Sequence, residues 1–195
     1  MATSSAALQL TRQLDHLRKN PVEGFSAGLV DDDNVFEWEI TIFGPPDTLY
    51  EGAFLRTTLS FPPDFPLRPP KMRFITEMWH PNVLIVASLL PTSLYSSVLC
   101  WYPYHGAVYK NGEVCISILH EPGADQFGYE DAGERWMPVH GVESILISVI
   151  SLLSQDTPDT NSPANVDAAK EVREDIIGYR KKVRRLARRS AEEGF

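Results

Sequence analysis

Five prolines fall within nine residues at positions 62–70 (PPDFPLRPP), and this segment constrains the fold more than any other. Proline donates no backbone hydrogen bond, so a sheet ladder cannot run through it and the segment must form a rigid loop. The residues on either side, 53–61 and 71–75, have the character of strands, as do residues 25–30 and 35–43. Four strands joined by short connections predict an antiparallel meander.

Helical patterns flank these strands. A first helix, ended by Asn20-Pro21, is indicated by three leucines at helical spacing, Leu10, Leu14 and Leu17. Later segments predict a helix with a wide apolar face over 142–153, a short helix from Val166 capped by Asn165, and a last helix from about 173 to 189. We therefore expect one α+β domain over residues 1–195, with an N-terminal helix, a four-stranded antiparallel meander and C-terminal helices.

Composition indicates an ordinary globular chain. Its 195 residues are 43% hydrophobic and 23% charged. Two cysteines do not make a disulfide framework, and the first residues lack the basic and apolar regions of a secretory signal. A reducing cytosolic or nuclear setting is therefore expected, in which a free thiol can be used chemically.

The net charge of −8 is unevenly distributed. Residues 180–189 hold seven of the 18 basic residues, which leaves 11 basic against 24 acidic groups, or −13, in residues 1–179. An acidic body argues against nucleic-acid binding, because phosphate contacts need clustered Lys and Arg. We interpret the basic stretch as the solvated face of a terminal helix, with contact to RNA or an anionic membrane as the alternative.

Cys115 stands out as a candidate nucleophile. It lies in residues 110–119 (KNGEVCISIL), a glycine turn followed by an apolar run that resembles a strand, and an Asn lies upstream in His80-Pro81-Asn82. The arrangement suggests a cysteine that carries an acyl group rather than one that hydrolyses peptides. The alternative is a small buried core residue, the commonest state of a free cysteine.

A segment without any Asp, Glu, Lys or Arg, residues 84–108, separates that Asn from the Cys. If it is removed, Val83 joins Tyr109 and the local sequence reads HPNVYKNG. Three explanations compete: a translated intron or splice variant, which we favour, a membrane-contacting loop, and a membrane span. Pro91, Pro103 and the many serines argue against a span.

Five motifs, in order along residues 5–190, resemble those of a ubiquitin-conjugating enzyme. They are residues 44–52 (GPPDTLYEG), 61–70 (FPPDFPLRPP), 80–82 (HPN), 111–119 (NGEVCISIL) and 136–139 (WMPV). The acidic loop at 121–135 narrows the resemblance to the G-type subgroup, which is associated with protein degradation at the endoplasmic reticulum. The resemblance implies that Cys115 accepts ubiquitin as a thioester and that a lysine then attacks it.

The resemblance also implies roles for the neighbouring residues. Asn82 would donate to the oxyanion, unless it is a turn Asn that bonds its own backbone. His80 and Pro81 would support the site, with His80 fixing the turn rather than acting as a base. Ser162 occupies a position where many relatives have an Asp, and His120 with the loop carboxylates would take over gating. Asp125 and Glu130 would attract the incoming lysine and orient its ammonium. A solvated, mobile acidic loop is the alternative.

Partners follow from the same resemblance. They are ubiquitin, a ubiquitin-activating enzyme, a RING-type ubiquitin ligase and protein substrates, with membrane contact only through the 84–108 segment or a ligase. The contact residues would be Leu67 and Pro138 towards the ligase, and Arg12, Arg18 and Lys19 towards the activating enzyme and the ligase. No metal-ligand spacing or phosphate-binding glycine loop is present, so we expect no cofactor, with ATP used by the upstream activating enzyme. The expected location is cytoplasmic, with recruitment to the endoplasmic reticulum and a nuclear location left open.

Two other functions stay open at this point. A catalytically impaired ubiquitin-pathway adaptor would result if the 84–108 segment displaced Asn82 from Cys115. A cysteine hydrolase would use Cys115 with a histidine such as His120 or His140, although the residues show no pattern that would orient such a base.

Overall fold

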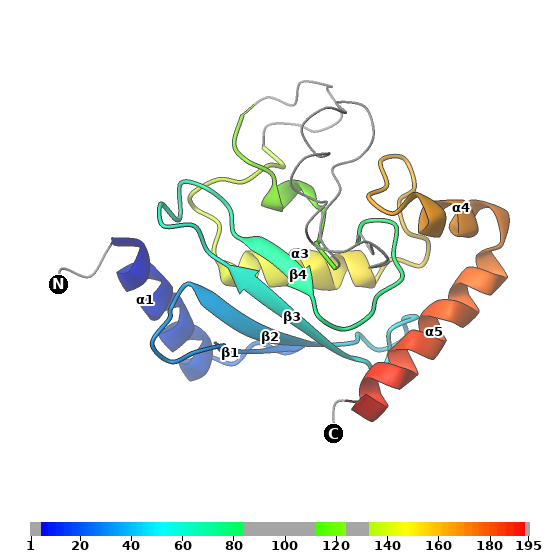
Figure 1. The fold of residues 1–195 in the computed structure, drawn as a ribbon, viewed down its shortest axis with the longest axis horizontal. Coiled ribbons are helices and arrows are strands. Elements are labelled where there is room, and N and C mark those ends of the chain that lie inside the picture. Colours follow the sequence, from blue (N-terminus) through cyan, green and yellow to red (C-terminus); the bar gives the residue numbers. More distant parts are fainter. Residues whose placement is uncertain (1–4, 84–111, 124–132, 194–195) are drawn as a thin grey trace, which may run out of the picture.

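The computed structural model describes residues 5–83, 112–123 and 133–193 (Figure 1). Its elements, in chain order, are α1 (Ser5–Lys19), β1 (Phe25–Leu29), β2 (Glu37–Phe43), β3 (Phe54–Ser60), β4 (Lys71–Phe74), a 3₁₀ turn η2 (Ser117–Leu119), α3 (Val142–Leu153), α4 (Val166–Glu174) and α5 (Ile176–Glu193). This is the α+β order expected from the sequence. The apolar segment 84–108 lies outside the described residues, and only 121–123 and 133–135 of the acidic loop lie within them.

The sheet is the predicted meander. Its four strands follow chain order, β1-β2-β3-β4, and each neighbouring pair is antiparallel. The register of β2 with β3 places Ile40 opposite Thr57 and Ile42 opposite Leu55. Since side chains alternate across a strand, these pairs put one apolar row of each strand on the same face of the sheet.

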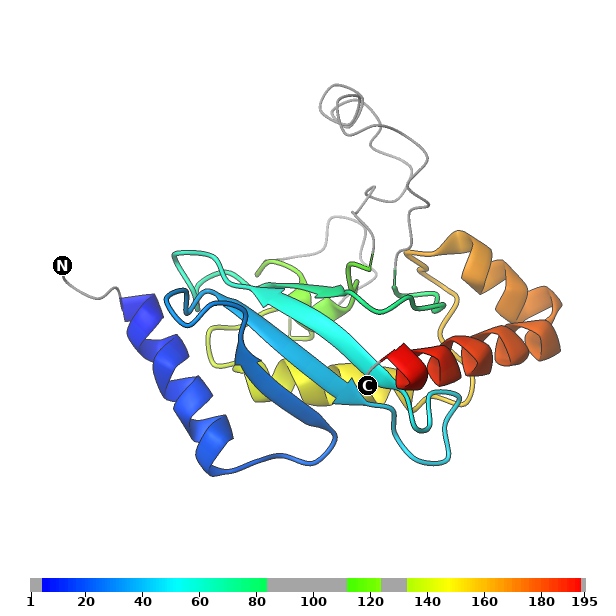
Figure 2. The same ribbon diagram turned by 60° about the horizontal axis from the view of Figure 1, so that its bottom comes forward.

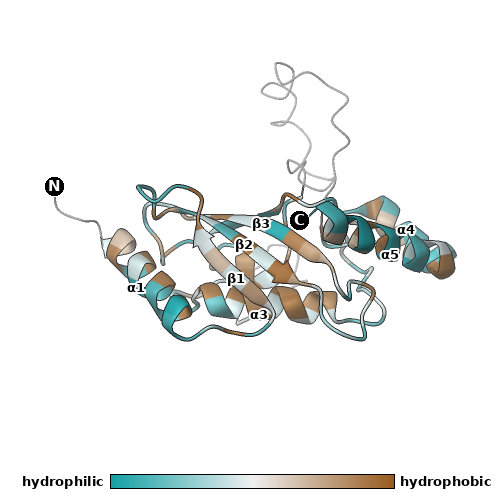
Figure 3. Ribbon diagram, turned by 90° about the horizontal axis from the view of Figure 1, so that it is seen from below, coloured by the Kyte–Doolittle hydropathy of each residue, from teal (hydrophilic) through white to brown (hydrophobic). Residues whose placement is uncertain are grey.

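Helix α3 covers that apolar face. In β2 the side chains of Trp38, Ile40 and Ile42 are buried, and α3 contributes Ile145 and Leu146 among others to the same core. Figure 2 shows α3 running along one side of the strands, and Figure 3 shows its mostly hydrophobic composition beside the mostly hydrophilic α5. The core therefore lies between the sheet and α3. The face of α3 that is buried there is the apolar face predicted from the pattern of residues 142–153.

The proline segment is a loop tied to the core, as the sequence requires. The ring of Phe65 packs between Phe61 and Trp136, with ring centroids 5.1 and 5.9 Å away. The indole Nε1 of Trp136 donates to the carbonyl oxygen of Pro66 at 2.7 Å. These contacts hold the proline loop against Trp136, which directly follows the acidic loop.

The last helix is shifted relative to its predicted bounds. It was expected over about 173–189, after a short helix from Val166, whereas α4 ends at Glu174 and α5 spans Ile176–Glu193. The cause is Asp175, whose backbone leaves the helical region (φ −145°, ψ 70°) and whose side chain accepts from the amide of Gly178 at 2.9 Å. An Asp in this position caps the new helix and lets it turn away from the old one.

Helix α5 returns along the sheet. The amide of Phe54 donates to Ser190 Oγ at 3.2 Å, and Arg189 pairs with Glu77. The helical unit α4–α5 thus packs at the end of the molecule opposite α1 (Figure 1). Among the described residues, no helix combines the length and the apolar character needed to cross a membrane.

Two neighbouring residues of α3 provide a matched test of this core. Leu146 is fully buried, whereas Ile147 beside it is 51% exposed. We expect Leu146→Ala to lower the free energy of unfolding by about 2–5 kcal/mol, because it leaves a cavity, and Ile147→Ala to change it by less than about 1 kcal/mol. Urea denaturation measures both, and equal losses would contradict this account of the core.

Candidate functional site

The segment that carries Cys115 lies between the edge of β4 and the turn at 80–83. The amide of Val114 donates to Met72 O in β4, and the amide of Cys115 donates to Asn82 O, both at 3.0 Å. Val114 also forms an antiparallel bridge with Val83. Cys115 and Asn82 are therefore neighbours in space, although 33 positions separate them in the sequence.

Gly112 allows the segment to approach β4 so closely. The amide of Phe74 donates to Gly112 O at 2.8 Å, and Gly112 has a φ of +86°. A side chain at this position would place its Cβ 2.0 Å from the carbonyl oxygen of Phe74. Both the left-handed backbone and the close contact require glycine here, which explains the glycine turn seen in the sequence.

The residues after Cys115 do not form the expected strand. Ser117–Leu119 is a 3₁₀ turn, in which Leu119 donates to Ile116 O and His120 donates to Ser117 O, each at 2.9 Å. A short apolar run does not by itself distinguish a strand from a helical turn. The turn brings His120 back towards the thiol, with Nε2 3.4 Å from Cys115 Sγ.

His80 holds the turn on the other side of the cysteine. It is only 1% exposed, and its Nδ1 accepts from the amide of Asn82 at 3.0 Å. Burial lowers the pKa of His80 from an ordinary 6.5 to about 4, so the ring is neutral at physiological pH. These contacts are those of a residue that fixes a turn.

Three buried polar atoms around this turn have no hydrogen-bond partner in the part of the chain that the structure describes. They are His80 Nε2, Asn82 Oδ1 and Asn165 Nδ2. Asn165 lies next to this turn because its backbone amide donates to Pro81 O at 2.7 Å. Buried polar groups are normally satisfied, so such a concentration is typical of a functional site.

A groove of about 760 Å³ opens beside the thiol. Its lining includes Cys115 and His120 together with charged side chains, Lys71, Arg73, Glu113, Glu121 and Arg135. Burial raises the pKa of the Glu113 carboxyl, an effect that the nearby cations Lys71 and Arg73 oppose. Cys115 is itself partly exposed, so its thiol is accessible from this groove.

Ser162 lies farther out. It is exposed in the loop before α4, and the bond from Asn165 to Pro81 brings that loop beside the turn at 80–83. No hydrogen bond between Ser162 and Cys115 exists among the described residues. Asp125 and Glu130 fall outside those residues.

The predicted contact residues are exposed and fall into two sets. Leu67 and Pro138 are exposed, and the Trp136–Pro66 hydrogen bond fastens their two loops together. Arg12, Arg18 and Lys19 are exposed on α1. The proline loop and the chain just after the acidic loop are therefore neighbours in space.

The sequence interpretation missed the residues that surround Trp79, immediately before His80. Trp79 contacts Glu171 of α4 and Lys182 of α5. The only available signal was an aromatic residue next to the His-Pro-Asn motif, because the contacts join positions about a hundred residues apart. Among the described residues, no group of three or more His, Cys, Asp or Glu could hold a metal ion.

Comparison with known proteins agrees with the family resemblance seen in the sequence. The family described as "Ubiquitin-conjugating enzyme" matches residues 9–90 and 91–187. Ubiquitin-conjugating enzyme E2 15 of Schizosaccharomyces pombe is 57% identical over 97% of this chain and 98% of its own length, and E2 14 of Arabidopsis thaliana is 52% identical over 98% and 99%. The structure of human ubiquitin-conjugating enzyme E2 G1 aligns with a TM-score of 0.59 at 49% identity, covering 80% of this chain and 99% of that one.

Enzymes of this family are thioester-forming transferases that work with ubiquitin, an activating enzyme and ubiquitin ligases. The fold, the matched profile and the identity to these relatives agree, and the chain belongs to the ubiquitin-conjugating enzyme family.

Proposed function

We propose that Cys115 accepts ubiquitin as a thioester and that Asn82 stabilises the oxyanion formed when a lysine attacks it. One observation carries the proposal: the amide of Cys115 donates to the carbonyl oxygen of Asn82 at 3.0 Å. This bond makes Cys115, the candidate nucleophile, and Asn82, the carboxamide residue of the His-Pro-Asn turn, backbone neighbours, which supports a shared site. The thiol also opens onto a groove large enough to admit an extended chain end.

The chemistry needs little more than these two groups. The Cys115 thiolate attacks the thioester carbonyl of ubiquitin on the activating enzyme, whose own thiolate leaves. A neutral lysine amine then attacks the new thioester, and the negative charge that develops on the carbonyl oxygen is stabilised by the Asn82 N–H. The intermediate collapses with cleavage of its C–S bond, which releases the Cys115 thiolate. The nitrogen gives up its extra proton to solvent, and the product is an isopeptide bond.

His120 and Ser162 support this site in the proposal. His120 Nε2 lies 3.4 Å from the thiol and so limits the directions from which an amine can approach. Ser162 stands on the loop that reaches the turn through Asn165, and offers a hydroxyl where many relatives carry a carboxylate. His80 keeps the turn in place through its contact with the Asn82 amide.

Partner recognition is assigned to the two exposed sets of residues. Leu67 and Pro138 are proposed to meet a RING-type ligase. Arg12, Arg18 and Lys19 on α1 are proposed to serve the activating enzyme and the ligase. The reaction uses no cofactor bound to this chain in our proposal, because the upstream enzyme spends the ATP.

The biological setting is proposed from the subgroup resemblance. It comprises degradative ubiquitin chains and a cytoplasmic location, with recruitment to the cytosolic face of the endoplasmic reticulum through a ligase. The impaired-adaptor alternative required that the 84–108 segment separate Asn82 from Cys115. Their direct backbone contact supports the transferase over that alternative.

A charging assay tests the role of Cys115. With activating enzyme, ATP and ubiquitin, the wild-type chain is expected to form an adduct that a thiol reductant removes. Cys115→Ala should form none, and Cys115→Ser should form a reductant-resistant ester, because oxygen replaces sulfur in the bond. Cys100→Ala is the matched control and should charge like the wild type. An adduct that survives in Cys115→Ala, or that needs no ATP, would refute the assignment.

A second assay separates charging from transfer. Asn82→Ala is expected to slow discharge of the thioester to free lysine by about 10²–10³-fold, the typical effect of losing one oxyanion donor. Charging should change far less, because the thiol is untouched. Asn161→Ala, in the loop near Ser162, is the control and should match the wild type. If Asn82→Ala slowed both steps equally, its role would be structural.

The buried His80 predicts a dependence of stability on pH. Its folded pKa of about 4 lies below the ordinary 6.5, so the unfolded chain takes up this proton first as the pH falls. The contribution of neutral His80 to the free energy of unfolding is complete above about pH 6.5 and is lost as the pH falls towards 4. At pH 5 the free energy of unfolding is lower by about 2 kcal/mol. His80→Asn keeps an acceptor for the Asn82 amide but does not titrate. Urea denaturation at pH 5.0 and 7.5 should show this loss in the wild type and not in the variant; the same pH response in both would contradict it.

A further inference from the structure

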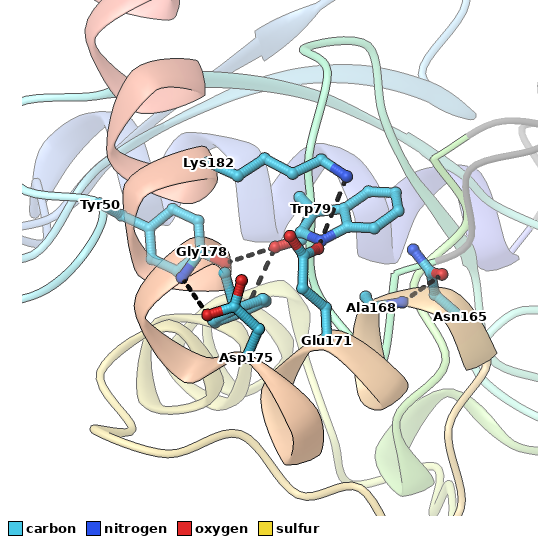
Figure 4. A network of polar contacts seen from close by, with 9 residues as sticks. Tyr50, Trp79, Asn165, Ala168, Glu171, Asp175, Gly178 and Lys182 are labelled. Carbon is cyan, nitrogen blue, oxygen red and sulfur yellow. Dashed lines mark hydrogen bonds and ion pairs between the residues drawn. The ribbon is translucent and has the colours of Figure 1, made fainter.

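Trp79, the residue before the His-Pro-Asn turn, lies between the two C-terminal helices. Its indole Nε1 donates to Glu171 Oε2 of α4 at 2.5 Å. The ammonium of Lys182 on α5 lies 2.9 Å from the centroid of the indole ring and 3.6 Å from Glu171 Oε2. Figure 4 shows the indole with Lys182 on one side and Glu171 at its nitrogen. One aromatic side chain thus joins both helices to the turn.

The backbone of Trp79 is held as firmly as its ring. The hydroxyls of Tyr50 and Tyr179 donate to its carbonyl oxygen, at 3.3 and 3.4 Å. Burial raises the pKa of Tyr50 well above its usual value and that of Tyr179 to about 12. Both hydroxyls therefore keep their protons, and can donate, throughout the physiological pH range.

The same helical unit reaches the next residues of the turn. Asn165 caps α4, since its side-chain Oδ1 accepts from Ala168 N, and its backbone amide donates to Pro81 O. The carbonyl oxygens of His80 and Asn82 accept from Val83 and Cys115. Every backbone carbonyl from Trp79 to Asn82 is thus hydrogen-bonded, whereas the Asn82 side-chain oxygen has no partner among the described residues. The backbone that carries the Asn82 carboxamide is therefore fixed at each of its carbonyl groups.

We propose that Glu171 and Lys182, acting through Trp79, are positioning residues that place the Asn82 carboxamide for attack on the thioester. They form what we name the Trp79 clamp: Trp79, Glu171 and Lys182. The inference rests on the proposed function, since it deepens the role of Asn82. None of the three residues contacts Cys115 among the described contacts, so the clamp acts by geometry and not by chemistry at the sulfur.

Partial burial distinguishes this ion pair from its neighbours. The side chains of Lys182 and Glu171 are 32% and 26% exposed, and both bind the indole. On the same helix α4, Lys170 and Glu174 form a pair 3.9 Å apart that is 64% and 67% exposed. An exposed pair contributes little, whereas a cation over an indole face is attracted by the ring as well. The Lys170–Glu174 pair is therefore a natural control.

The test compares Glu171→Ala and Lys182→Met with the controls Glu174→Ala and Lys170→Met. The Met substitution keeps most of the apolar stem and removes the charge. We expect single-turnover discharge of the Cys115 thioester to free lysine to fall about 10-fold in both clamp variants, since a small misplacement of a positioned group slows the reaction. Charging and both controls should stay within about 2-fold of the wild type.

A double variant identifies the route of the effect. If the clamp acts through Asn82, Glu171→Ala should slow discharge by less than about 2-fold when Asn82 is already Ala, because coupled sites are not additive. The side-chain amide resonances of Asn82 should also shift in Glu171→Ala and stay unchanged in Glu174→Ala, a readout that needs no ubiquitin.

Several outcomes would refute the proposed role of the Trp79 clamp. They are discharge at the wild-type rate in both clamp variants, an equal fall in charging and discharge, or a full 10-fold additional loss in the Asn82→Ala background. Should Glu171→Ala not fold, Lys182→Met and its control decide the question alone. A wild-type chain that forms no adduct would instead remove the proposed function itself, so the two failures are distinguishable.

Discussion

One backbone hydrogen bond, from the amide of Cys115 to the carbonyl oxygen of Asn82, is the contact on which the site depends. It joins two parts of the chain that are distant in sequence. One is the segment 112–115, which pairs with β4, and the other is the turn at 80–83, which comes soon after β4 along the chain. Glycine at 112 permits it, because any side chain there would collide with the backbone of Phe74. The segment of the nucleophile and the turn of the amide group thus come together through main-chain contacts, which do not use the two side chains.

The sheet and the C-terminal helices contribute differently to this arrangement. The sheet and α3 form much of the apolar core, which gives the 112–115 segment a rigid edge to pair with. The helices α4 and α5 add Val172, Val183 and Ala187 to that core, and they also supply polar contacts, through Asn165, Glu171, Tyr179 and Lys182, that end on residues 79–81. The C-terminal helices therefore contribute both to stability and to the position of the His-Pro-Asn turn.

Local patterns in the sequence predicted the elements well where one physical signal dominates. The prolines of 62–70 excluded a strand, the strand expected over 35–43 contains β2, and Asn165 caps α4 as expected. The errors came from competing local signals. Residues 116–119 are apolar enough for a strand but close a 3₁₀ turn. The last helix was predicted to start too early, because Asp175 was not recognised as the residue that caps it.

The site could be predicted only in part. Motifs identify Cys115, Asn82 and His80, but the approach of His120 to the thiol depends on the turn that the strand interpretation missed. The partners of Trp79 lie 92 and 103 residues further along the chain, on helices whose packing no local pattern specifies. Long-range contacts of this kind are decided by the tertiary fold.

The bridge between Val83 and Val114 has a consequence for how such a chain can change over time. The two chain ends on either side of residues 84–111 meet there, fastened to one another and to β4 by bonds that involve no residue in between. The entropy of closing a loop grows only slowly with its length. Extra sequence can therefore accumulate at this junction at small energetic cost to the framework, which makes it a point where lineages can diverge in length without redesigning the enzyme.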